Sequence, residues 1–257
     1  MQMALNHCEL LNFAPSQWCT NAATFTALNQ NGEVCVAILV LLVGGSAAQS
    51  YHELTRVAQV YTWSFDRRFP KCLGRPFAEG IGPYLNDSAA QIPYFSETKI
   101  QKIASGGYYS AAITDDGELY VWGQASPTPA GARCELGVLQ DKADEDEDEF
   151  VRSVRLEIDG RPAKAVDVSV GWGHLLVVVE AKDDSQQLTT AVFAAGRNEH
   201  GQLASLSRRG SVQKFAELPE FRGWAVEQLV CTGYTSYVVV RRRPGCELGR
   251  TLTSGDD

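Results

Sequence analysis

Histidine is scarce in this sequence, with four among 257 residues. The cysteines are scattered along the chain, and no two of them form a C-x-x-C pair. A zinc site needs several such ligands at short spacing, so we expect no metal site. The odd number of cysteines argues against a disulfide framework and favours reduced thiols, which are typical of intracellular proteins. The seven are Cys8, Cys19, Cys35, Cys72, Cys134, Cys231 and Cys246.

The sequence also lacks the motifs of common catalytic sites. It contains no Gly-x-Ser-x-Gly, no His-Glu-x-x-His and no Gly-x-x-x-x-Gly-Lys-Ser/Thr phosphate loop. The stretch Gly171–His174 has the glycines of a phosphate-binding loop, but a run typical of a strand follows it, where such a loop needs a helix. We therefore expect a non-enzymatic protein with no catalytic residue and no cofactor.

An excess of positive charge is absent, because the formal net charge is −8. This argues against a broad nucleic-acid-binding face, and the triplet Arg241–Arg243 is interpreted as the start of a polar tail, 241–257. Acidic residues are concentrated in the run 141–149, which predicts a solvated surface loop. The alternative for this run is a contact with a basic partner, such as a histone tail or another Lys/Arg-rich peptide.

No apolar run is long enough to cross a membrane. The longest, Val34–Ala48, has 15 uncharged residues, whereas a spanning helix needs about 20. Polar residues follow it at once, and the segment Met1–His7 lacks the basic region of a signal peptide. We expect an intracellular protein of the cytoplasm or nucleus, without a membrane contact.

The clearest structural signal is the stretch Ala104–Gly123, which predicts two strands joined by a tight turn. The pair Asp116–Gly117 favours a hairpin with a type I′ turn. Residues 110–113 and 119–122 are small, apolar or aromatic at almost every position. A strand that is apolar on both sides cannot face water, so this hairpin is predicted to lie between two other layers.

The pattern of this hairpin recurs along the chain. A copy with the turn Asn31–Gly32 precedes it, and two looser copies follow. Gly106, Gly171 and Gly233 mark three of the copies and are 65 and 62 residues apart. The copies cover 22–34, 166–196 and 226–240. Such internal repetition is typical of a stacked architecture in which neighbouring units cover one another's apolar faces.

These residues resemble the regulator-of-chromosome-condensation repeat family, within the superfamily of beta-lactamase-inhibitor protein II. The resemblance rests on Ile103–Gly106, Gly117–Gly123 and Gly196–Leu203, and it covers most of residues 20–240. It implies an all-β fold, a β-propeller, which in this family usually has seven four-stranded blades. The chain 1–257 is accordingly interpreted as one partial propeller domain with three to four recognisable blades.

The number of repeats is smaller than the family's ring requires. About three and a half units can be found, which leaves three explanations open. The chain is a truncated or mis-assembled gene product, which we favour; or diverged units lie in 1–20 and 64–99; or two copies associate to complete a ring.

Members of the family act as guanine-nucleotide exchange factors for the Ran GTPase, as adaptors, and as inhibitors that cap other proteins. The resemblance therefore implies a protein partner, such as a small GTPase, and the acidic run 141–149 adds a basic peptide as the other candidate. We predict a protein-interaction module that binds its partner through its loop face, and the alternative is an exchange factor for a Ran-like GTPase. The candidate binding residues lie beside the repeated glycines: Tyr108, Tyr109, Trp172, His174 and Tyr234. Each of them has packing between blades as its other interpretation.

The segment 34–59 interrupts the first copy of the hairpin. Removing its 26 residues would join Asn31–Glu33 directly to Val60–Trp63, as in the hairpin at 104–123. Two hypotheses account for it, a translated intron and a genuine loop insertion. The intron hypothesis predicts transcripts that lack this segment, which reading the message across the junction would detect. Messages that retain the segment in every tissue and growth state would rule the intron out.

Overall fold

A computed structural model describes the backbone of residues 15–20, 24–29, 34–39, 49–54, 60–64, 70–76, 90–125, 136–140, 148–204 and 210–241. These residues form β-strands and four short 3₁₀ turns, and no α-helix occurs among them. The turns are η2 (Pro70–Leu73), η3 (Pro93–Phe95), η4 (Gly137–Leu139) and η5 (Pro219–Phe221). Within the same ranges, no helix is long and apolar enough to span a bilayer.

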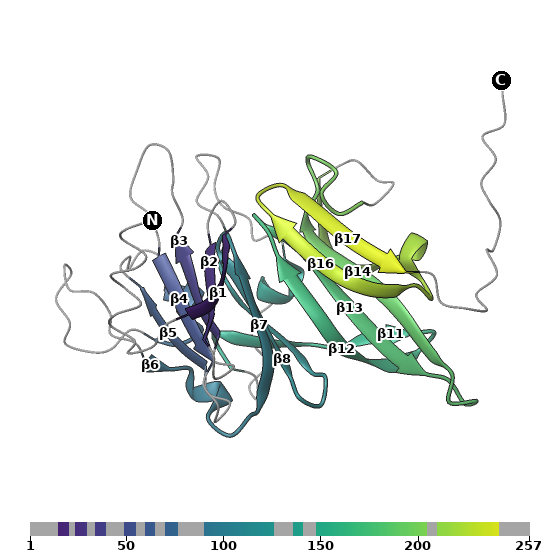
Figure 1. Ribbon diagram of the computed structural model, residues 1–257, viewed down its shortest axis with the longest axis horizontal. Helices are drawn as coiled ribbons and strands as arrows, with labels where there is room; N and C mark the ends of the chain where they lie inside the picture. Colours follow the sequence, from purple (N-terminus) through teal and green to yellow (C-terminus); the bar gives the residue numbers. More distant parts are fainter. Residues whose placement is uncertain are drawn as a thin grey trace.

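The strands form four antiparallel sheets that follow one another along the chain (Figure 1). The first has six strands in sequence order: β1 (Pro15–Thr20), β2 (Thr24–Asn29), β3 (Val34–Leu39), β4 (Gln49–Leu54), β5 (Val60–Ser64) and β6 (Ala90–Gln91). The second has four: β7 (Ile100–Gly106), β8 (Tyr109–Thr114), β9 (Leu119–Gly123) and β10 (Val151–Val154).

The third sheet contains β11 (Leu156–Ile158), β12 (Arg161–Val170), β13 (His174–Lys182), β14 (Leu188–Arg197) and β15 (Ser211–Leu218). The fourth is the pair β16 (Ala225–Thr232) and β17 (Thr235–Arg241). In every sheet, strands that follow one another in the chain are also neighbours in space. This simple meander is what hairpin turns between short strands produce.

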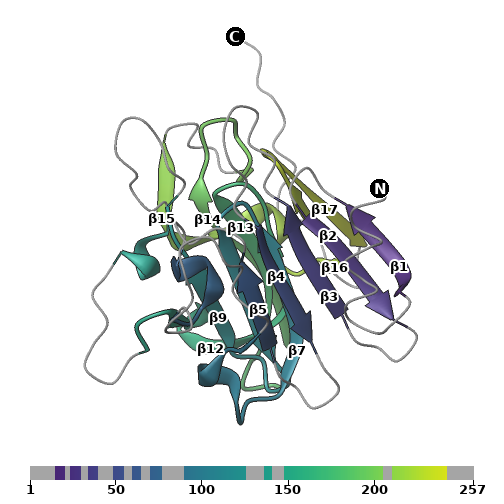
Figure 2. The ribbon, with the colours of Figure 1, turned by 90° about the vertical axis from the view of Figure 1, so that its left-hand side faces the viewer.

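The segment 34–59 supplies two strands to the first sheet. β3 pairs with β2, and β4 pairs with β3 and β5, so two strands separate β2 from the strand that begins at Val60. Figure 2 shows β1 to β5 side by side in this order. This pairing does not test whether the segment is present in the mature protein, so the intron hypothesis stays a prediction.

Side chains on alternate positions of a strand pack into different layers. In β8, Tyr109, Ala111 and Ile113 belong to the cluster shared with the third sheet, whereas Ala112 belongs to the cluster on the other side. In β13, Leu175 and Val177 face the second sheet, and Leu176 and Val178 face the fourth. Strands with both faces buried between layers were expected from the sequence, and the structure confirms them.

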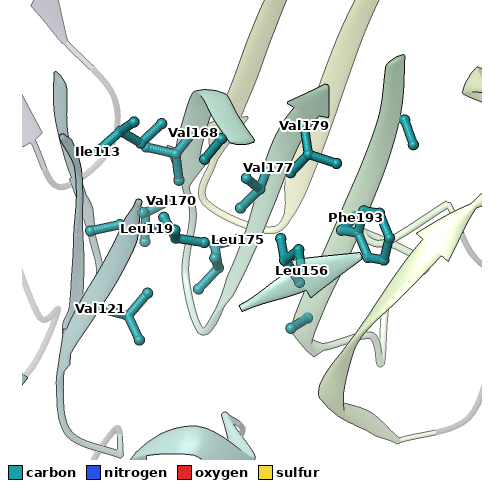
Figure 3. Close-up of a cluster of buried hydrophobic side chains, with 14 of the residues drawn as sticks. Ile113, Leu119, Val121, Leu156, Val168, Val170, Leu175, Val177, Val179 and Phe193 are labelled. Atoms are coloured by element: carbon teal, nitrogen blue, oxygen red, sulfur yellow. The ribbon is translucent and has the colours of Figure 1, made fainter. Parts of the chain in front are cut away.

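Aliphatic side chains from both sheets meet in the layer between the second and third sheets. Figure 3 shows Ile113, Leu119 and Val121 from the second sheet opposite Val168, Val170 and Leu175 from the third. Each of these side chains is at most 2% exposed. Burying a side chain of this size contributes about 2 kcal/mol, so the stacking of the sheets is the main source of stability.

Strands β7, β12 and β16, one in each of the second, third and fourth sheets, have the same irregularity at the equivalent position. The register shifts between Ile100 and Lys102 in β7, between Ala165 and Asp167 in β12, and between Val226 and Gln228 in β16. An extra residue of this kind bends a strand and increases its twist. Its recurrence shows that the sequence repeat is also a structural repeat.

The hairpin at Asp116–Gly117 is present, but its turn is not of type I′. A type I′ turn needs positive φ at both central residues, and only Gly117 has it, with φ of 92°. The Gly117 amide donates to the Thr114 carbonyl at 3.1 Å, and the Thr114 side-chain oxygen accepts the Glu118 amide at 2.9 Å. The Thr114 hydroxyl therefore stabilises a wider turn, and its hydrogen bond to Asp116 lowers the pKa of that carboxyl group.

The second and third sheets approach so closely at Gly106 that their backbones touch. A Cβ atom at this position would lie 2.2 Å from the Val170 carbonyl oxygen, a distance that real structures do not show. Further out, the Ala165 amide donates to the Gly117 carbonyl at 2.8 Å. The absence of a side chain at Gly106 therefore sets the spacing of the two sheets.

Gly106→Ala is predicted to lower the free energy of unfolding by about 3 kcal/mol, at the upper end of overpacking effects. The added methyl group must push the Val170 backbone away and open the apolar layer. Chemical denaturation measures the change. Gly210→Ala is the control, because its site is open and only its φ of 74° opposes a side chain, which costs about 1 kcal/mol. Equal losses in the two variants would show that the sheets do not touch at Gly106.

Candidate interaction surface

Three neighbouring turns, one in each of the second, third and fourth sheets, bring aromatic residues together. They join β7 to β8 through Gly107 and Tyr108, β12 to β13 through Trp172 and Gly173, and β16 to β17 through Gly233 and Tyr234. The Trp172 amide donates to the Gly233 carbonyl at 2.8 Å, which ties the second of these turns to the third. Glycine supplies the positive φ at one position of each turn.

The aromatic rings of these turns, together with the ring of His200 after β14, form a continuous row, which we call the aromatic row: Tyr108, Trp172, Tyr234 and His200. The ring centroids of Tyr108 and Trp172 are 5.9 Å apart at 84°, and those of Trp172 and Tyr234 are 6.3 Å apart at 49°. The His200 ring lies 4.9 Å from the Tyr234 ring. These separations are typical of edge-to-face and tilted aromatic contacts, each worth about 1 kcal/mol.

Exposure increases along the aromatic row. Tyr108 is 3% exposed, Trp172 is half-buried, and Tyr234 is 45% exposed. The buried end therefore anchors the row between the sheets, while the Trp172 and Tyr234 rings are available at the surface. The packing interpretation of Tyr108 is thus confirmed, whereas binding by Trp172 and Tyr234 stays a prediction.

Two of the predicted binding residues lie inside the protein. Tyr109 is 1% exposed and belongs to the layer between the second and third sheets. His174 is fully buried, and its Nε2 lies 2.9 Å from the Ser236 Oγ. Both are the first residues of strands, where the alternation of faces points them at the next sheet rather than at solvent. A direct contact of these two side chains with a partner is therefore ruled out.

His174, Ser236 and Cys231 form a small polar cluster between the third and fourth sheets. The Ser236 hydroxyl lies 3.5 Å from the Cys231 sulfur, and the Cys231 amide donates to the Ser169 Oγ at 2.8 Å. Burial lowers the pKa of His174 to about 4 and raises the pKa of the Cys231 thiol to about 11. An activated cysteine needs the opposite shift, so the cluster holds two sheets together and is not suited to nucleophilic chemistry.

His200 also belongs to this surface, and it lies within the stretch Gly196–Leu203 that carries the family resemblance. Its turn is held from below: the Asn198 Oδ1 accepts the Leu203 amide at 3.0 Å, and the Gln202 Oε1 accepts the His200 amide at 2.9 Å. Asn198, Gln202 and Leu203 are buried. The Asn-x-x-Gly-Gln-Leu pattern therefore fixes the turn, and its contact with Tyr234, 34 residues later, could not be read from local sequence.

Only the end of the acidic run 141–149 belongs to the described part of the chain. Residues 141–147 lie outside the described part of the chain, and so does 242–257 of the predicted polar tail. The carboxylate of Asp148 accepts the amides of Phe150 and Val151, both at 2.8 Å, at the start of β10. Within the described ranges, no three His, Cys, Asp or Glu side chains are grouped as a metal site would require.

The stacked meanders define the class of this protein, a β-propeller assembled from repeated sheets. Residues 100–126 match the family model described as "Regulator of chromosome condensation (RCC1) repeat". This match agrees with the resemblance that the sequence indicated. The matched residues include β7, β8 and β9, and with them Tyr108 and Tyr109.

A curated relative and several solved structures extend this likeness. The chain is 36% identical over 89 residues to the "RCC1 domain-containing protein RUG3, mitochondrial" of Arabidopsis thaliana. The aligned region covers 35% of this chain and 19% of that protein. A chain in the crystal structure of Kap60 bound to yeast RCC1 (Prp20) superposes with a TM-score of 0.58 at 16% identity, over 90% of this chain and 55% of that one.

Two further structures agree with this fold. Prp20p from Saccharomyces cerevisiae gives a TM-score of 0.57 at 14% identity, over 91% of this chain and 57% of that chain. Human WBSCR16 gives 0.56 at 12% identity, over 90% and 59%. At these identities the likeness shows the fold alone, a β-propeller of the chromosome-condensation-regulator type. The chain spans less than two thirds of each of these proteins.

The stability of the protein is predicted to fall between pH 6.5 and pH 4 because of His174. Its pKa drops from 6.5 to about 4 on folding, so as the pH falls the unfolded chain takes up the proton first. The contribution is complete above pH 6.5 and decreases by about 3 kcal/mol as the pH approaches 4. Urea unfolding at a series of pH values measures the slope. His174→Gln should flatten it, and identical slopes for the two proteins would contradict this assignment.

Proposed function

We propose that the protein is a non-enzymatic interaction module that binds a protein partner through the surface formed by Trp172, Tyr234 and His200. The single observation that carries this proposal is the aromatic row, which crosses three sheets and ends in exposed rings. Aromatic side chains dominate the energetics of protein interfaces, because they bury a large area at a small cost in side-chain entropy.

The rigidity of the row supports a role in binding. The Trp172 ring contacts aromatic rings on both sides, and its backbone amide is bonded to Gly233. The His200 turn is fixed by buried Asn198 and Gln202. Rings that are already ordered lose little freedom when a partner arrives, so more of the contact energy contributes to affinity.

The charge of the protein favours a partner that carries basic side chains. A net charge of −8 attracts cationic proteins over long distances, and the faces of Trp and Tyr rings bind Lys and Arg side chains directly. A basic partner is also consistent with the structural likeness to Prp20p, whose crystal structure was described together with its binding properties to Gsp1p and histones. We infer a basic peptide or a small GTPase as the partner, within an intracellular compartment.

The second candidate is an exchange factor for a Ran-like GTPase. Its support is the fold shared with yeast RCC1 over 90% of this chain. Release of a fluorescent guanine nucleotide from a purified GTPase separates the two candidates, because a simple binding module leaves the release rate unchanged.

Tyr234→Ala and Trp172→Ala are predicted to weaken partner binding at least about tenfold, the effect of removing a central aromatic contact. The probes are Lys/Arg-rich histone-tail peptides and a Ran-type GTPase, and calorimetry or fluorescence anisotropy measures the dissociation constants. Tyr94→Ala is the matched control, since Tyr94 is 38% exposed and lies in η3, outside the row. Binding that the row variants do not change would contradict the proposal, and so would failure of both probes to bind.

A further inference from the structure

One face of the fourth sheet carries exposed apolar side chains. Tyr237 and Val239 lie two residues apart on β17 and are 57% and 46% exposed. They are the two most exposed large hydrophobic side chains among the residues whose burial the structure describes. Two positions apart on a strand means the same face of the sheet, so the two side chains form one patch.

The repeat shows what covers this face in the preceding sheets. The pairs Gly106–Tyr109 and Thr232–Thr235 close the turns that lead into β8 and β17, and the bond from the Gly171 amide to the His174 carbonyl closes the turn before β13. Counted from these closures, Tyr237 corresponds to Ala111 and Leu176, and Val239 corresponds to Ile113 and Val178. Those four residues are at most 3% exposed, because the next sheet lies on them.

The other face of the fourth sheet is already occupied. Leu229 and Cys231 of β16 are buried against the third sheet, and Val238 of β17 packs beside them. The patch therefore continues a repeated sheet-to-sheet interface, and none of the described residues forms a layer that covers it. On β16, Val230 lies beside Tyr237, which extends the apolar patch to both strands, and the polar Gln228 lies beside Val239.

We propose that a second copy of this chain covers the patch, with the β16–β17 faces of two molecules packed against each other about a two-fold axis. Both faces of the second and third sheets take part in buried layers. Within the part of the chain whose side chains are described, the β16–β17 face is thus the apolar sheet face that a second molecule can offer. When one surface meets itself, the contact closes as a symmetric dimer.

The composition of the patch suits such a contact. Aromatic and β-branched side chains occupy its centre, and the ion pair of Glu227 and Arg241, at 2.8 Å, lies at the end of the strands away from the turn. Sheets that pack face to face bury centres of this kind and leave charges at the rim.

Light scattering after size-exclusion chromatography, over a range of protein concentrations, tests the proposal. The wild-type chain is expected to be a dimer, and Val239→Lys is expected to raise the dimer dissociation constant at least tenfold. Val166→Lys is the matched control, because Val166 is 41% exposed on β12, outside the patch, and should leave the dimer intact. A wild-type monomer at every concentration would overturn the proposal, as would equal effects of the two lysines.

A photo-crosslinking residue at position 237 gives a second test that does not depend on disrupting the fold. Benzoylphenylalanine in place of Tyr237 is expected to produce a covalent dimer, with crosslinked peptides from β16 and β17 of the other molecule. The same residue in place of Tyr94 should give no dimer. Crosslinks that stay within one chain, or no crosslink at all, would show that the patch is not covered by a second copy.

Discussion

Contact between neighbouring sheets across layers that exclude water is the interaction on which the rest of this structure depends. Each central strand is apolar on both faces, so no sheet can stand alone in water. The layers close only because the backbones meet without an intervening side chain, as Gly106 does at the Val170 carbonyl. Gly171 has a different role within the third sheet, since a Cβ there would lie 2.2 Å from the Cε1 of the buried His174 ring.

The stacking also creates the candidate binding surface. The second, third and fourth sheets repeat the same hairpin, so its turns lie next to one another. Their rings are spaced at about 6 Å. The row of Tyr108, Trp172 and Tyr234 is thus a consequence of the repeat rather than an addition to it. At the fourth sheet the same repetition leaves Tyr237 and Val239 without a covering layer among the described residues.

Much of this architecture could be predicted from the sequence, because it depends on local patterns. The recurring glycines, the runs with both faces apolar and the turn at Gly117 indicate antiparallel sheets buried between layers. The burial of Tyr109 and His174 could not be predicted, since it depends on which residue closes each turn. The sequence aligned Gly233 with Gly106 and Gly171, whereas the structure places Gly233 one position later, in line with Gly107. A shift of one residue exchanges the two faces of a strand.

Contacts between sheets are equally invisible to local patterns. Lys102 and Asp167 form an ion pair across 65 residues, and His200 meets Tyr234 across 34. Such pairs depend on how far one sheet is rotated against the next. That rotation depends on the twist of the strands and on the register shifts in β7, β12 and β16. The prediction of a type I′ turn was wrong for a local reason, because the Thr114 side chain stabilises a wider turn.

Amide hydrogen exchange tests the stacking of the sheets most directly. Two amides donate across the interfaces at 2.8 Å, Ala165 to the Gly117 carbonyl and Trp172 to the Gly233 carbonyl. Neither bond exists unless the sheets are stacked as described. The account predicts that these amides exchange as slowly as those at the centre of β13. Exchange at the rate of an exposed loop would contradict the stacked arrangement.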